Sequence, residues 1–175
     1  MGNRNGTARR AALVGVMTAL SLILLWLSAI LPTGRWGLIA AAGLLPAAVI
    51  ISSGLSGGFF CWLATGLLAF VLLPDKMNML LYLLFFGVYP MIKFLLERMR
   101  KLPLELLCKL IFFNLVLTLF WFVFRELFLP ALPQMLQLAW AAYVAGNAAF
   151  LVYDYGFTKL IGFYMARFAP HLRKR

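Results

Sequence analysis

Three apolar segments between residues 77 and 160 carry polar and aromatic side chains at helical spacing. Residues that recur at i, i+4, i+7 and i+11 lie along one face of an α-helix. Amides, hydroxyls and charges are costly in hydrocarbon, so such a face should turn toward protein or a water-filled cavity. The pattern predicts a substrate-binding pocket lined by three helices. Its candidate residues are Asn78 and Tyr82 in the first segment, Asn114, Thr118, Trp121 and Arg125 in the second, and Trp140, Tyr143 and Asn147 in the third.

Each of these residues also has a purely structural interpretation. Trp and Tyr near helix ends commonly anchor at the membrane interface, and a lone Asn or Thr commonly forms an interhelical hydrogen bond. Arg125 either contacts a ligand, pairs with Glu126, or extends to the lipid headgroups. Asp154 either extends the polar face into the pocket, anchors the helix at the inner boundary, or forms an ion pair there with Lys159, which is the favoured alternative.

A loop with a cation follows the first apolar segment of the chain. Arg35 and Trp36 form either a lid over the pocket, with Arg35 as a cationic hook, or an ordinary turn followed by an interfacial tryptophan. Because Arg35 and Arg125 are expected on the same side of the membrane, an acidic small molecule is the favoured ligand.

Metalloprotease and nucleotide-binding motifs are missing from the sequence. It has no HExxH or Walker A motif, and its single histidine, His171, lies in a basic tail. Cys61 and Cys108 form no CxxC pair, so neither a metal site nor a disulfide is indicated. We therefore expect no cofactor and no enzymatic activity. If the protein were an enzyme acting on lipid, its only candidate acid–base residues would be Arg125, Glu126 and Asp154.

The composition determines which elements must position these residues. The 175 residues are 65% hydrophobic and 12% charged, with a mean hydropathy of +0.96, whereas soluble domains average about 45–50% apolar and 25% charged residues. This excludes a soluble enzyme, a disordered chain and a disulfide-stapled secreted module. The net charge of +11 is explained by basic residues that flank membrane helices, so no nucleic-acid partner is expected.

The apolar runs predict a six-helix transmembrane bundle forming one integral membrane domain over residues 1–175. A break is expected within residues 52–58, which are rich in Gly and Ser, and Pro46 is expected to kink the second span. The spans are predicted at residues 11–31, 36–53, 58–73, 77–96, 104–129 and 134–160, with a basic tail at 167–175.

The distribution of basic residues predicts the orientation of these spans. With six spans, the Lys and Arg residues fall on the side of the two termini, except for Arg35, Lys76 and Arg125. The positive-inside rule then places both termini in the cytoplasm.

Small residues recur every four positions at the start of the first span, at Ala11, Gly15 and Ala19. This spacing allows another helix backbone to approach closely. The partner helix is either another span of this chain or a separate membrane protein.

These features together resemble the substrate-capturing S component of an energy-coupling factor (ECF) transporter. The resemblance rests on the chain length, the six spans, the Ala11, Gly15 and Ala19 repeat, and the outward pocket. It implies uptake of a vitamin or similar micronutrient, and docking through Ala11, Gly15 and Ala19 on a transmembrane coupling protein with ATPase subunits. It also implies that the loop around Arg35 closes over the substrate, and that the protein is a multi-pass protein of a prokaryotic plasma membrane.

The substrate stays open, because the residue sets typical of the riboflavin, thiamine, biotin and folate members are not recognisable. The second position of the docking repeat is Gly15 where the family usually has alanine. The alternative function is a non-transport membrane scaffold of the rod-shape-determining type, in which the polar faces only join helices.

Overall fold

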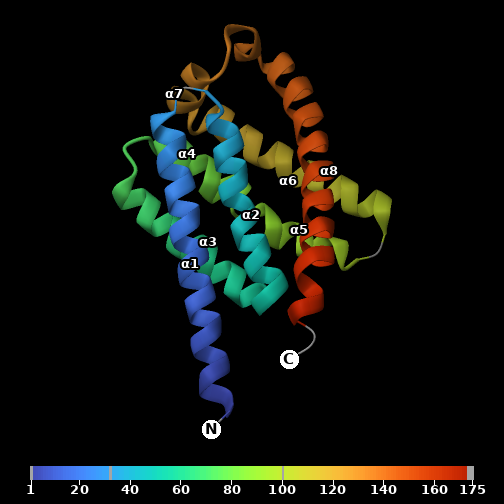
Figure 1. Cartoon of the computed structure of the whole chain (residues 1–175). Coiled ribbons are helices and arrows are strands. Elements are labelled where there is room, and N and C mark those ends of the chain that lie inside the picture. Colours follow the sequence, from blue (N-terminus) through green and yellow to red (C-terminus); the bar gives the residue numbers. More distant parts are fainter. Residues whose placement is uncertain (1, 32, 100, 173–175) are drawn as a thin grey trace. The chain divides into compact units, whose positions relative to one another are not determined.

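The structure is a computed structural model that describes residues 2–31, 33–99 and 101–172. All regular secondary structure in the described residues is helical, which confirms the predicted all-helical class (Figure 1). Contacts divide the chain into two compact units, Met1–Phe94 and Leu95–Arg175, and each is described by itself. Of the basic tail predicted at 167–175, only the backbone up to residue 172 is described.

The first unit is built on three mutually contacting helices, α1 (Gly2–Ile30), α2 (Arg35–Ser53) and α3 (Leu55–Leu72). Helix α1 is 29 residues long, about 44 Å at 1.5 Å per residue, compared with a hydrocarbon core of about 30 Å. Its N-terminal turns extend beyond the ends of α2 and α3 (Figure 1).

Glycines with positive φ separate these three helices. Gly34 (φ 78°) precedes α2, and Gly54 (φ 85°) separates α2 from α3; glycine adopts this backbone region without steric cost. The predicted break within residues 52–58 is thus confirmed, but it is confined to Gly54. Gly57 and Gly58 lie inside α3, where a Cβ on Gly58 would collide with Ile50. They serve close helix packing instead of the turn.

The predicted span 77–96 is not a regular α-helix. It consists of α4 (Lys76–Leu81), the π-helix η1 (Tyr82–Phe86) and α5 (Tyr89–Glu97). In η1 the carbonyl of Tyr82 accepts a hydrogen bond from Gly87 N at 2.7 Å, five residues on. The indole of Trp62 on α3 donates to the Leu83 carbonyl at 3.1 Å. A side chain from a neighbouring helix therefore compensates a carbonyl of the irregular turn.

The second unit contains α6 (Leu102–Phe122), α7 (Arg125–Phe128), two 3₁₀ turns (Leu129–Ala131 and Gln134–Gln137) and α8 (Ala139–Leu172). The predicted fifth span, 104–129, is wrong at its C-terminal end. Helix α6 stops at Phe122, before the charges of Arg125 and Glu126, which are expensive to place in hydrocarbon.

Helix α8 also differs from the span predicted at 134–160. It begins at Ala139 and continues without a break for 34 residues, about 50 Å at helical rise. The segment is thus one long helix, with no break that would separate a membrane span from an interfacial helix.

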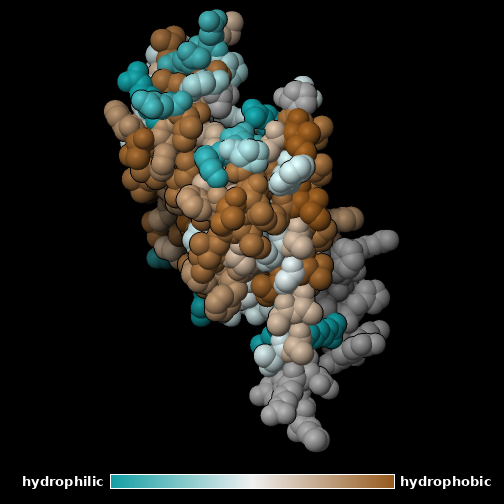
Figure 2. All heavy atoms as spheres, turned by 90° about the vertical axis from the view of Figure 1, so that its left-hand side faces the viewer, coloured by the Kyte–Doolittle hydropathy of each residue, from teal (hydrophilic) through white to brown (hydrophobic). Residues whose placement is uncertain are grey.

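Five helical segments among the described residues are long and apolar enough to cross a membrane. Their outward faces are rich in large apolar side chains, as shown by Val71 of α3, which is 77% exposed. The face drawn in Figure 2 is covered mainly by hydrophobic residues. These features support a multi-pass membrane protein, while the sixth span and the location of the termini stay predictions. The five segments are Gly6–Ile30, Arg35–Ser53, Leu55–Leu72, Lys76–Glu97 and Leu102–Phe122.

Candidate functional site

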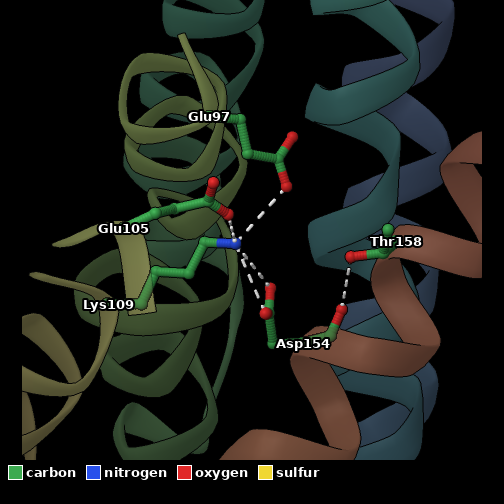
Figure 3. Close-up of polar contacts among 5 residues, drawn as sticks. All are labelled: Glu97, Glu105, Lys109, Asp154 and Thr158. Atoms are coloured by element: carbon green, nitrogen blue, oxygen red, sulfur yellow. Dashed lines mark hydrogen bonds and ion pairs between the residues drawn. The ribbon is translucent and has the colours of Figure 1, made fainter. Parts of the chain in front are cut away.

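A buried lysine with three carboxylates is the most highly charged feature of the second unit (Figure 3). The side chain of Lys109, on α6, is 3% exposed. Its Nζ lies 2.5 Å from Glu105 Oε1, and 3.3 Å from both Glu97 Oε1 and Asp154 Oδ2. We call these four residues the lysine cluster. A buried ammonium group is strongly destabilising unless it is paired with an opposite charge. Here the three partner carboxylates come from three helices.

Local helix geometry explains how the lysine cluster assembles. Glu105 precedes Lys109 by four residues on α6, the spacing at which side chains meet on one helix face. Glu97 is the last residue of α5, and Asp154 comes from α8, where Thr158 Oγ1 donates to its main-chain carbonyl at 2.9 Å. Lys109 therefore ties α6 to α8 and to the end of α5.

Asp154 forms an ion pair, as expected. Its partner is Lys109, whereas the sequence suggested Lys159. Five residues after Asp154, Lys159 lies more than a third of a turn around α8. Its Nζ lies 5.3 Å from the Tyr155 ring centroid instead. Among the described residues, no group of three or more His, Cys, Asp or Glu is arranged to hold a metal ion.

Two asparagines join α6 to α8 through a reciprocal amide pair. Asn114 Nδ2 donates to Asn147 Oδ1 at 2.9 Å, and Asn147 Nδ2 donates to Asn114 Oδ1 at 3.0 Å. Each Nδ2 also donates to the carbonyl four residues earlier on its own helix, Leu110 or Tyr143, at 2.8 Å. Both hydrogens of each amide are therefore used inside the protein.

A hydroxyl pair continues this contact. Thr118 Oγ1 and Tyr143 Oη are 2.6 Å apart. As the residue number rises along α6 it falls along α8, so the two helices are joined in opposite chain directions. We call the three pairs the polar ladder: Lys109 with Asp154, Asn114 with Asn147, and Thr118 with Tyr143.

Aromatic packing accompanies the polar ladder. The rings of Phe113 and Phe150 stack with centroids 4.7 Å apart. Gly146 provides room on α8, because a Cβ at this position would already lie 3.3 Å from the Phe113 ring and 3.4 Å from Leu117. Lys109 and Gly146 are not among the residues predicted from helical spacing, although an intramembrane charge is a signal in its own right.

Seven predicted site residues lie in this unit. The polar ladder contains four of them, Asn114, Thr118, Tyr143 and Asn147. The other three lie outside it. Trp121 is half-buried, with its ring 6.5 Å from that of Phe128. Arg125 is exposed at the start of α7 and, among the described residues, pairs with no carboxylate, Glu126 included. Because α6 has ended, Arg125 no longer shares the face of Asn114 and Thr118. Trp140 is 70% exposed.

Trp140 contributes instead to a shallow apolar hollow in the second unit. The hollow has a volume of about 500 Å³ and is formed by the 3₁₀ turn Gln134–Gln137 and the first turns of α8. Its lining residues are Met135, Leu136, Leu138, Trp140, Ala141, Val144, Ala145 and Ala148.

Asn78 and Tyr82, two of the four predicted substrate-binding residues in the first unit, face its interior. Asn78 Nδ2 donates to Ser28 Oγ at 3.2 Å, and Ser28 in turn donates to the Leu25 carbonyl at 2.6 Å. Tyr82 is completely buried. Asn78 therefore connects α4 to α1.

Arg35 is engaged in an ion pair within the first unit. Its Nη2 lies 2.9 Å from Asp75 Oδ2, while Asp75 Oδ1 accepts hydrogen bonds from the main-chain N–H groups of Met77 and Asn78 and so caps α4. Arg35 thus holds the start of α2 against the start of α4. Trp36 beside it is 43% exposed.

Ala11, Gly15 and Ala19 lie on an exposed face of α1. A Cβ added at Gly15 would have no other atom within 4 Å, so the space around this residue is open. A different face of the same helix, with Thr18, Ser21, Leu25 and Ser28, is buried. Within the described residues, the small-residue face is therefore not used for contact with another span.

Over residues 2–31, 33–99 and 101–172, the fold and these contacts define a helical protein with internal polar pairs and five helices that are long and apolar enough to cross a membrane. No family model, curated protein or solved structure matches it.

Proposed function

We propose that the chain is the membrane-embedded substrate-binding subunit of a small-molecule uptake transporter. In this proposal it docks through α1 on a transmembrane coupling protein that carries ATPase subunits. The observation that supports it best is the exposed face of Ala11, Gly15 and Ala19, which has open space around Gly15. Small residues on a lipid-facing helix let a partner helix approach to backbone contact.

Two further observations support capture of a small molecule. The hollow of about 500 Å³ beside Trp140 is within the range of about 300–1,000 Å³ typical of small-molecule sites. Arg125 is an exposed cation on the predicted outer side, whereas the charge of Arg35 is compensated by Asp75. An acidic ligand would therefore be attracted first by Arg125.

Affinity purification from the membranes of the host organism tests this function. The tagged chain should retain a vitamin-like small molecule, identified by mass spectrometry, and should co-purify with an ATPase-bearing partner. A preparation that is folded but retains neither would contradict the proposal.

Replacement Gly15→Leu should abolish co-purification of the partner while leaving the chain folded. The new side chain meets no atom of this chain within 4 Å of its Cβ, but it would hold a partner helix away. The measurement is the amount of ATPase recovered per amount of tagged chain. Gly162→Leu on α8 is the matched control, because Gly162 is also exposed and open. Unchanged recovery with Gly15→Leu would contradict docking through this face.

A membrane scaffold is the second candidate function, and the polar ladder favours it. Two of its pairs use the polar atoms of α6 and α8 to hold the helices together. In a scaffold no ligand is retained, and Asn147→Leu weakens assembly instead of uptake.

The amide pair of the polar ladder should show energetic coupling in a double-mutant cycle. Asn114→Leu and Asn147→Leu should each reduce the free energy of unfolding by about 1–2 kcal/mol, because each leaves the opposite amide without its partner. The double replacement should cost less than the sum of the two. Chemical denaturation in detergent micelles measures all four proteins, and additive effects would contradict the reciprocal pair.

A further inference from the structure

Two buried hydroxyl groups in the first unit form no hydrogen bond of acceptable geometry with any described residue. They are Oγ1 of Thr65 on α3 and Oη of Tyr82, the first residue of the π-helix. Both residues are fully buried. A buried hydroxyl without a hydrogen-bond partner destabilises the folded state, so a pair of such groups in one unit requires a physical explanation.

The two hydroxyls belong to the same polar region. Thr65, Ser21 and Cys61 are close enough to the Tyr82 hydroxyl to interact with it. Ser21 Oγ donates to the Ala42 carbonyl at 3.3 Å, and Thr18 Oγ1 donates to Cys61 Sγ at 3.7 Å. Ser21 can therefore still accept a hydrogen bond.

The π-helix is a second sign that this region is specialised. Single π-turns are rare and recur at functional sites. Here the turn begins at Tyr82, the same residue whose hydroxyl is unsatisfied, and it is supported by the Trp62 indole from α3. The irregular turn determines where the Tyr82 ring enters the interior.

We propose that this region is a binding site for one water molecule, held by the Tyr82 and Thr65 hydroxyls and donating to Ser21 Oγ. Buried water typically makes about three hydrogen bonds to otherwise unsatisfied groups, and these three hydroxyls provide that number. The three groups are neutral, which suits water better than a cation. The water would connect α1, α3 and the π-helix independently of the proposed transport function.

Solid-state NMR of the full chain in lipid bilayers tests the site. With tyrosine labelled with ¹³C at Cζ, magnetisation should transfer from water to Tyr82 at short mixing times, although the residue is fully buried. The Tyr82 signal is the one that disappears in Tyr82→Phe, or is assigned by sequential correlations if this variant does not fold. The transfer should be lost in Thr65→Val and retained in Thr65→Ser, which keeps the hydroxyl.

Three outcomes separate the water site from its alternatives. Transfer in the wild type that is lost only in Thr65→Val supports the proposal. Absence of transfer in the folded wild type overturns it, and indicates a direct contact between the two hydroxyls. Transfer that persists unchanged in Thr65→Val also overturns it, because the water would not be held between these groups.

Discussion

Replacement of Lys109 by methionine should destabilise the protein strongly. The variant keeps the length and the apolar stem of the side chain but removes the ammonium group, and three carboxylates remain around its place. Breaking a buried ion pair by removing one partner costs about 3–5 kcal/mol. We expect a strongly lowered thermal midpoint in detergent and a low yield of folded protein.

The same substitution at Lys159 is the matched control. Lys159 lies on α8, and its ammonium group is held near the Tyr155 ring at an exposed position. Because exposed cation–π contacts contribute only about 0.5–1 kcal/mol, Lys159→Met should lower the midpoint slightly. If Lys109→Met were as stable as Lys159→Met, the lysine cluster would not hold the second unit together.

Adding Asp154→Asn to Lys109→Met should recover part of the lost stability. The second replacement removes one of the three carboxylates that repel each other once the ammonium group is gone. In the wild-type background Asp154→Asn alone should be destabilising, because it weakens the pairing of Lys109. This reversal of sign distinguishes an electrostatic cluster from simple loss of packing, which would make the two costs add.

Replacement of Gly43 by alanine should have the largest effect in the first unit. A Cβ on Gly43 of α2 would collide with the main-chain oxygen of Phe86 in the π-helix and lie 3.0 Å from the Phe86 Cβ. The main-chain atoms cannot move as a flexible side chain can, so α2 and the π-helix must separate. Overpacking of this kind costs roughly 1–3 kcal/mol, and the thermal midpoint should fall accordingly.

Gly37→Ala provides the matched control on the same helix. A Cβ on Gly37 has nothing within 4 Å, and alanine is favoured over glycine inside a helix by up to about 1 kcal/mol. The control should therefore leave the midpoint unchanged or raise it. Equal midpoints for Gly37→Ala and Gly43→Ala would contradict the close approach of α2 to the π-helix.

The polar ladder bears directly on the choice between transporter and scaffold. The faces of α6 and α8 that were predicted as polar do turn toward protein. In two of the pairs, however, the polar side chain of one helix forms hydrogen bonds with the side chain of the other helix. A substrate site in this unit would therefore rely on other groups, such as Arg125 and the hollow beside Trp140. In the first unit, the exposed α1 face is the feature that a transporter partner could use.

The sequence by itself determined the membrane character of the chain, its helical class and most helix boundaries. Runs of about 20 apolar residues can satisfy their main-chain hydrogen bonds in lipid only as helices, and charges, glycines and prolines interrupt these runs. The C-terminal ends of α1, α2 and α3 and the break before α3 follow from this physics. The error at Phe122 arose because residues 123–129 are apolar apart from Arg125 and Glu126, so hydropathy alone extended the helix.

Tertiary structure decided which polar groups meet. Helical spacing places Asn114 and Thr118 on one face, but it does not specify whether that face contacts a ligand, a lipid headgroup or another helix. The partner of Asp154 depended on the position of α6 against α8, which no local pattern encodes. The π-helix at Tyr82 likewise depends on Trp62 and Gly43, two residues distant in sequence whose side-chain donor and missing Cβ make the irregular turn possible.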